Sequence, residues 1–126
     1  MTKIIIETTN APAPIGPYNQ AIKSGNTLYV SGQVAIVPED GSMKTSDITE
    51  ETHQVMKNLG NILTQAGMDF TNVVKCSIFI KDMGNFATIN EAYGSYFPSE
   101  APARETVEVS GLPKNVNVEI SCIATD

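Results

Sequence analysis

The sequence predicts an α+β fold in which two helices pack on one face of a mixed β-sheet. Apolar residues recur at helical spacing in two stretches, residues 47–66 and 85–97. The segments around them are rich in β-forming residues and are bounded by Gly, Pro, Asn and Asp. The predicted order is strand, hairpin, helix, strand, helix, strand, strand. Two helices cover only one face of such a sheet.

The composition describes one globular domain, residues 1–126, with 41% hydrophobic and 17% charged residues. A net charge of −6 argues against broad nucleic-acid binding, which draws on basic surface. No apolar run is long enough for a signal peptide or a membrane span, so we expect a cytoplasmic protein with no membrane partner. The low charged fraction hints that part of the surface is buried against sister subunits.

Cysteine and histidine are sparse. Cys76 and Cys122 both fall in predicted strands, and without a secretion signal we expect free, buried thiols. The single histidine, His53, lies off the apolar stripe of its helix, which predicts a solvated side chain and no catalytic role. Without Cys-x-x-Cys or His-x-x-x-His spacing, no metal site is expected.

The first third of the chain contains three predicted strands and a rigid loop. Residues 3–7 form the first strand, and the proline-rich residues 11–18 exclude regular structure and hold Tyr18 in a fixed place. Tyr18 is either an aromatic plug with its hydroxyl bonded to backbone or a ligand contact. Residues 20–23 and 27–31 form a hairpin around Ser24-Gly25-Asn26.

Ser31, Gly32 and Gln33 end that hairpin. A glycine within a strand pattern indicates a bulge or a close backbone approach, so Gly32 is a candidate for either. Ser31 is either an ordinary strand serine or a hydroxyl that faces a ligand.

The first helix begins near Asp47, whose spacing to Glu50 is that of a capping pair, and it ends at Gly67. Its apolar stripe is core: Ile48, Val55, Met56, Leu59, Ile62, Leu63 and Ala66. A strand at 73–81 follows, and then the second helix, which stops before Pro98.

The apolar face of the second helix consists of Phe86, Ile89, Tyr93 and Phe97. Asn90 falls on the same face, which predicts a buried amide that must find hydrogen bonds. It either supports a loop backbone or contacts a ligand or a positioned water.

The last two strands, at 102–109 and 116–123, carry the most informative charges. Alternation places Arg104, Thr106 and Glu108 on one face. Glu119 is a lone carboxylate within an apolar strand. Arg104 and Glu119 form either an ion pair between two neighbouring strands or part of an anion site, because a guanidinium matches a carboxylate bidentately. The sheet face without helices also carries apolar residues, which favours an oligomer.

Several short motifs together resemble those of the RidA (YjgF) family. They are Ile15-Gly16-Pro17-Tyr18, Ser31-Gly32-Gln33, Phe86-Ala87-Thr88-Ile89-Asn90, Pro102-Ala103-Arg104, and Gly111-Leu112-Pro113 with Val118-Glu119-Ile120. The resemblance covers essentially the whole chain, in order. It implies a chorismate-mutase-like α+β domain that forms a homotrimer with clefts between subunits.

The resemblance also implies hydrolysis of reactive 2-enamine and 2-imine acids, such as 2-aminoacrylate and 2-iminobutanoate, to 2-oxo acids and ammonia, without metal or cofactor. By position, Arg104 would hold the substrate carboxylate and Glu119 would orient water or move protons. The substrate-binding residues would be Tyr18, Ser31, Gly32, Asn90, Arg104 and Thr106. Thr106 stands where the family often has a cysteine, and Glu105 where it prefers a small residue; neither departure affects the hydrolysis.

Two other functions fit the same residues. A regulatory protein that binds 2-oxo acids would use the same cleft, since it also needs Arg104. An RNA-cleaving or translation-inhibiting protein is the other, although the negative charge and the lack of a basic stripe weigh against it.

Overall fold

A computed structural model describes residues 2–126. The six strands are β1 (Lys3–Ile6), β2 (Ala21–Ser24), β3 (Thr27–Gln33), β4 (Val73–Ile80), β5 (Ala103–Glu108) and β6 (Val118–Thr125). The two α-helices are α1 (Ile48–Gln65) and α2 (Phe86–Gly94). Neither helix combines the length and the hydropathy needed to cross a lipid bilayer.

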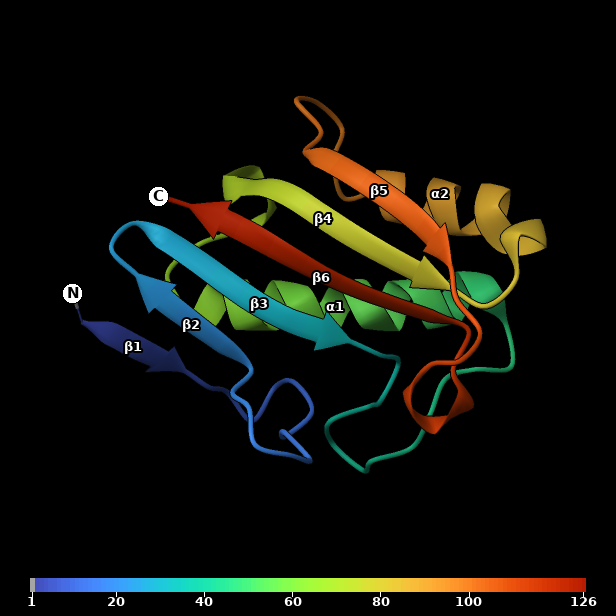
Figure 1. Cartoon of the computed structure of the whole chain (residues 1–126), viewed down its shortest axis with the longest axis horizontal. Helices are drawn as coiled ribbons and strands as arrows, with labels where there is room; N and C mark the ends of the chain where they lie inside the picture. Colours follow the sequence, from blue (N-terminus) through green and yellow to red (C-terminus); the bar gives the residue numbers. More distant parts are fainter. Residues whose placement is uncertain (1) are drawn as a thin grey trace.

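The strands form one mixed sheet in the order β1-β2-β3-β6-β4-β5 (Figure 1). β4 and β5 are parallel, and all other neighbours are antiparallel. The mixed sheet confirms the predicted fold class. The expectation that the last two strands are neighbours is wrong, because β4 lies between β5 and β6. The chain between them crosses the end of β4, since β5 runs antiparallel to β6.

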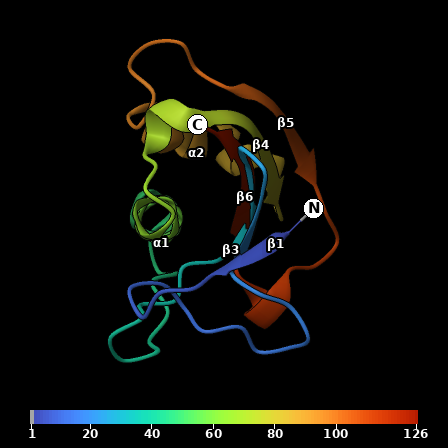
Figure 2. The same ribbon diagram turned by 90° about the vertical axis from the view of Figure 1, so that its left-hand side faces the viewer.

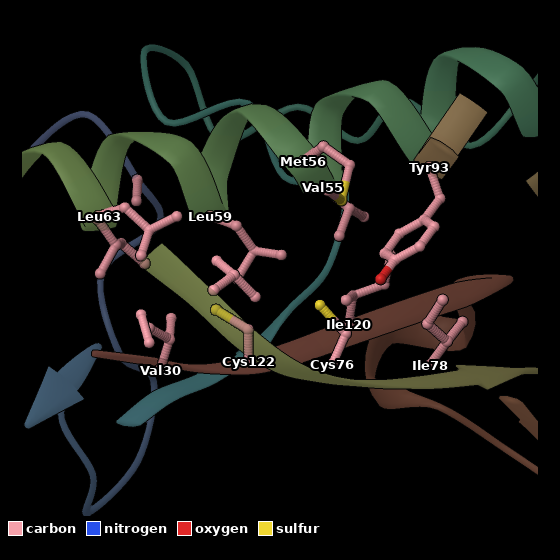
Figure 3. Packing of buried hydrophobic residues seen from close by; sticks show 14 of the residues in the cluster. Val30, Val55, Met56, Leu59, Leu63, Cys76, Ile78, Tyr93, Ile120 and Cys122 are labelled. Atoms are coloured by element: carbon pink, nitrogen blue, oxygen red, sulfur yellow. The ribbon is translucent and has the colours of Figure 1, made fainter. Parts of the chain in front are cut away.

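Both helices lie on the same face of the sheet, as Figure 2 shows. The core fills the space between α1 and the central strands (Figure 3). Its fully buried side chains include Leu59, Ile78 and Ile120. Apolar side chains of a two-layer fold are removed from water at this interface, which supplies the main driving force for folding.

The apolar stripe of α1 faces the sheet as its spacing predicts. Val55, Met56, Leu59, Ile62 and Leu63 are all buried. The Asp47 side chain caps the helix by accepting a hydrogen bond from the backbone nitrogen of Glu50 at 3.3 Å. At the other end, Gly67 has a φ of +76°, the left-handed conformation that commonly follows a helix.

Three local expectations are wrong. The second helix ends at Gly94 and not at Phe97, because turn hydrogen bonds replace helical ones after that residue. β6 begins at Val118, two residues later than expected. His53 is half-buried and not fully solvated, since its Nδ1 lies 2.9 Å from the hydroxyl of Tyr96.

The face of the sheet without helices carries a row of apolar side chains. The strand register aligns Ile5, Ile22, Tyr29 and Ile123 across four neighbouring strands. Ile5 and Tyr29 are each about half exposed, at 54% and 51%. We refer to this surface as the open face.

Candidate active site

A pocket of about 330 Å³ lies where the end of β3 meets the beginning of β6. Its wall comes from the proline-rich loop, the end of β3 with the chain after it, and the turn before β6. The lining residues are Pro12, Ala13, Ile15, Tyr18, Gln20, Ser31, Gly32, Gln33, Val34, Ile36, Pro113, Lys114 and Glu119. We call it the Glu119 pocket.

Gly32 makes room for the carboxylate. The register between β3 and β6 shifts between Val30 and Gln33, so the chain bulges at this glycine. A Cβ atom at Gly32 would lie only 2.6 Å from Oε2 of Glu119 and 2.7 Å from its Cδ. The bulge and the close approach, which the sequence pattern leaves as alternatives, are therefore both present.

Glu119 is half-buried and has no hydrogen bond or ion pair to any of residues 2–126. Burial raises the pKa of its carboxyl above the ordinary value of 4.5, because desolvation disfavours the charged form. A carboxyl with a raised pKa and unused lone pairs suits proton transfer near neutral pH.

Ser31 and Tyr18 both line the Glu119 pocket, but their hydroxyl groups differ in hydrogen bonding. The Ser31 hydroxyl donates a hydrogen bond to the carbonyl of Asn19 at 2.6 Å, which leaves its oxygen free to accept another. Tyr18 is 48% exposed, and its hydroxyl has no partner within residues 2–126. The plug alternative for Tyr18, with its hydroxyl bonded to backbone, is therefore wrong.

Arg104 lies at one edge of the sheet, on strand β5, where the register places it beside Cys76. Its guanidinium lies 5.3 Å from the ring centroid of Tyr93 and 5.6 Å from that of Phe86. Nη1 donates a hydrogen bond of 2.6 Å to Oδ1 of Asn90. We call these three α2 residues the Arg104 platform. Cation–π contacts and one charge-assisted hydrogen bond restrict the guanidinium, while its remaining N–H groups stay available.

Asn90 itself is exposed, so the expectation of a buried amide is wrong. Its side-chain oxygen accepts the hydrogen bond from Arg104, and its NH₂ group faces solvent, where a ligand or a water can accept from it. Thr106 follows Arg104 on the same strand face. Its hydroxyl oxygen is buried and has no hydrogen-bond partner within residues 2–126.

The Glu119 pocket and the Arg104 platform do not meet within one chain. Cys76 and Cys122 are paired opposite each other, and Arg104 is aligned with Cys76, so Arg104 is on the helix side of the sheet. Glu119 alternates with the buried Val118 and is therefore on the open face. The predicted site residues thus form two groups, and the Arg104–Glu119 ion pair between neighbouring strands is wrong.

The predicted set did not include most of the pocket wall. Ile36 and Val34 come from irregular chain after β3, and Pro113 and Lys114 come from the turn before β6. One signal was available, because the Gly-Leu-Pro motif precedes Lys114 directly. The apolar residues after β3 carry no comparable signal.

Both cysteines are free thiols on the helix side of the sheet, as expected. Cys122 is thus on the opposite face from Glu119. Burial raises the pKa of the Cys76 thiol, and it raises that of Cys122 to about 12. Among residues 2–126, no group of three His, Cys, Asp or Glu side chains is placed to hold a metal ion.

Comparison with known proteins gives consistent matches over the whole fold. Residues 8–126 match the family model described as Endoribonuclease L-PSP. The chain is 48% identical to a mouse protein named 2-iminobutanoate/2-iminopropanoate deaminase, over 95% of this chain and 89% of that one. It is 45% identical to the chloroplastic Reactive Intermediate Deaminase A of Arabidopsis thaliana, over 98% of this chain and 66% of that one.

A solved structure agrees with the sequence matches. The crystal structure of Escherichia coli TdcF with bound serine superposes with a TM-score of 0.94 at 36% identity, covering 98% of each chain. The family model covers more than nine-tenths of the sequence, and the relatives extend over nearly all of it. The chain therefore belongs to the RidA (YjgF) family.

Proposed function

We propose that this protein hydrolyses reactive 2-enamine and 2-imine acids, such as 2-aminoacrylate/2-iminopropanoate and 2-iminobutanoate, to 2-oxo acids and ammonia. The observation that carries the proposal is the pair of complementary groups: a restrained guanidinium with N–H donors left over, and a half-buried carboxyl that has no partner within residues 2–126. Relatives that share 44–48% of their residues with this chain are named as deaminases of these substrates.

The chemistry needs one anion anchor and one proton carrier. The substrate carboxylate pairs with the Arg104 guanidinium, which fixes the imine carbon beside a water molecule. Glu119 accepts a proton as the water oxygen forms its bond to the imine carbon. The same carboxyl passes this proton to the nitrogen, which gives a carbinolamine. A second proton then moves from the new hydroxyl through the carboxyl to the amino group, so the C–N bond breaks and ammonia leaves as the C=O bond forms. The buried hydroxyl of Thr106, which has no partner in the part of the chain that the structure describes, offers a further hydrogen bond beside Arg104.

We further propose that the active cleft forms between copies in a homotrimer. Within one chain, β4 and the thickness of the sheet separate Arg104 from Glu119. A second copy that packs on the open face would cover its apolar row and bring its own Arg104 to the Glu119 pocket. The aligned, half-exposed Ile5 and Tyr29 support this surface as the interface.

The remaining features fit a cytoplasmic enzyme that acts as one domain, residues 1–126. Free buried thiols suit a reducing compartment. The proposed partners are therefore the small imino or oxo acid and further copies of the same chain, without a metal or cofactor.

Turnover of 2-iminobutanoate, generated in situ by a threonine dehydratase, tests the function. The native protein should accelerate the release of ammonia and 2-oxobutanoate. Arg104→Ala should lower kcat/KM by about 100-fold or more, since it removes two charge-assisted hydrogen bonds. Glu119→Gln should lower kcat while KM changes little. If Arg104→Ala keeps full activity, the carboxylate anchor is elsewhere.

Mixing the two inactive variants tests the shared cleft. When Arg104→Ala and Glu119→Gln chains are unfolded and refolded together, about a quarter of the clefts combine an intact arginine with an intact glutamate. Activity should then recover to roughly that fraction. If each active site lies within one chain, the mixture stays as inactive as its components.

Two observations favour alternative functions that the experiments should also examine. The TdcF crystal structure has bound serine, a small carboxylate, which fits a protein that binds without turnover. Saturable binding of 2-oxobutanoate without catalysis would favour such a 2-oxo-acid-binding regulator. The family model is described as an endoribonuclease, so salt-dependent RNA binding or cleavage by the pure protein would favour that activity.

A further inference from the structure

The first turn of α1 contains a carboxylate that is completely buried and belongs to no ion pair within residues 2–126. Glu51 has an exposed fraction of 0%. Its Oε2 accepts hydrogen bonds from the backbone nitrogens of Asn117 at 2.8 Å and Val118 at 3.2 Å. Its Oε1 accepts one from the Asn117 side-chain amide at 2.7 Å. A buried charge requires such donors, and here they all come from the two residues that precede Glu119.

Asn117 is held from both sides. Its N–H groups are bound by Glu51, and its carbonyl accepts a hydrogen bond from the backbone nitrogen of Lys81 at 3.1 Å. The Val118 side chain is fully buried in the core. The backbone position of Glu119 is thus determined by its two neighbours, and strand alternation directs its side chain to the pocket.

The turn before these residues has an unfavourable backbone. Lys114 and Asn115 have φ values of +55° and +56°, a conformation that residues other than glycine seldom adopt. Lys114 lines the Glu119 pocket. Such a turn persists only when the surrounding structure fixes it, and Glu51 holds its end at Asn117.

The same helix holds the opposite wall of the pocket. Asn58, also fully buried, donates hydrogen bonds to the carbonyls of Val34 at 3.1 Å and Ile36 at 2.9 Å. Gln54 donates to Oδ1 of Asn58 at 3.0 Å. One polar row on α1, spaced so that its members share a helix face, therefore contacts one wall of the Glu119 pocket directly and also the two residues that precede Glu119.

We propose that Glu51 is a positioning residue for the deamination: it fixes the beginning of β6 and thereby the place of the Glu119 carboxyl in its pocket. The proposal rests on the proposed function where it assigns proton transfer to Glu119. The structural part, that Glu51 sets the environment of Glu119, is independent of turnover.

Two readouts test Glu51→Ala in the full-length protein. The first is the titration of the Glu119 carboxyl by carbon-13 NMR, assigned with Glu119→Gln. The other titratable side chains that line the pocket are Tyr18 and Lys114. We expect the midpoint to move toward that of an exposed glutamate, because the carboxyl becomes more hydrated. The second is turnover of 2-iminobutanoate generated in situ, where kcat should fall about 10- to 100-fold while KM changes less.

Matched variants separate positioning from general stability. Glu51→Gln should keep the Glu119 titration midpoint and kcat close to their native values. Its amide oxygen can accept both backbone N–H groups, and its NH₂ can donate to a flipped Asn117 amide. Leu63→Ala removes apolar volume from the same helix far from the pocket. It should lower the melting temperature without moving the Glu119 titration or kcat. Should Glu51→Ala fail to fold, Asn117→Ala removes only the side-chain hydrogen bond and should shift both readouts in the same direction, by less.

The proposal is overturned if Glu51→Ala, or Asn117→Ala in its place, lowers the melting temperature but leaves the titration midpoint of the Glu119 carboxyl at its native value. An unchanged kcat beside a shifted titration would also overturn it. If the native protein has no deaminase activity, the proposed function fails, and the titration alone decides whether Glu51 positions Glu119.

Discussion

The Glu119 pocket and the Arg104 platform differ in what positions their charged groups: mainly backbone around Glu119 and side chains around Arg104. Around Glu119 the main determinants are backbone: a bulge at Gly32, a turn with left-handed residues and hydrogen bonds to main-chain groups. Around Arg104 they are side chains of one helix, two aromatic rings and an amide. Backbone determinants tolerate little change, whereas side-chain determinants contribute separately. Substitutions in the two regions should therefore differ in size and in the kinetic constant that they affect.

Gly32→Ala should have the largest effect. The added Cβ would overlap the Glu119 carboxylate, which must leave its place because the strand backbone cannot shift easily. We expect kcat to fall by about 100-fold, a size typical of a misplaced catalytic group. Steady-state kinetics of the variant measure this directly.

Gly94→Ala is the matched control, because a Cβ there meets no atom within 4 Å. It should leave kcat unchanged. Native kinetics in Gly32→Ala would mean that the carboxylate has a second productive position. Backbone geometry would then not be what positions Glu119.

Asn90→Ala should have an intermediate effect, mainly on KM. It removes one hydrogen bond to the guanidinium while both aromatic contacts remain, so Arg104 stays near its place but is less restrained. A hydrogen bond to a charged group contributes about 1.5–3 kcal/mol, and because two ring contacts remain we expect KM to rise only about 10-fold. Thr88→Ala, at an exposed position of the same helix, is the control. An unchanged KM would show that the rings alone restrain Arg104.

The smallest expected effect is that of Glu119→Gln on stability and its pH dependence, which is separate from the loss of kcat expected of this variant. The folded-state pKa of Glu119 is raised, so the folded protein holds this proton more tightly than the unfolded chain and the ionised carboxyl is destabilising. The variant should melt roughly 1–3 °C higher at neutral pH, a small gain because the carboxyl keeps contact with solvent. The gain should shrink as pH falls through the raised pKa and vanish below about 4.5.

Melting curves of both proteins between pH 4 and pH 8 test this prediction, and the difference between them cancels the other titrating groups. An equal melting temperature at every pH would mean that Glu119 is as hydrated in the folded protein as in the unfolded chain. The contrast between a desolvated pocket and an accessible platform would then disappear.

Local patterns predicted the helices and the faces of the strands. The stripe from Val55 to Leu63 placed α1 on the sheet, and alternation correctly placed Arg104 and Thr106 on one face of their strand. Such patterns depend on spacing alone, which the sequence contains completely.

The order of the strands in the sheet could not be predicted from local patterns. The last two strands were expected to be neighbours, yet β4 lies between β5 and β6, because strand order depends on contacts between distant residues. For the same reason the buried polar row was missed: Glu51 and Asn58 resemble a solvated helix face until the chain around Val34 and Asn117 packs on them.

The two sulfur atoms of the core have a practical consequence for spectroscopy. Both native thiols are buried, and Cys122, with a pKa of about 12, is fully protonated at neutral pH. Maleimide reagents, which react with accessible thiolates, should therefore not modify them. A single Lys57→Cys substitution on the exposed side of α1 would then carry a spin label or a fluorophore at one defined place. Distances between labels on different copies would report the geometry of an assembly without removal of either native cysteine.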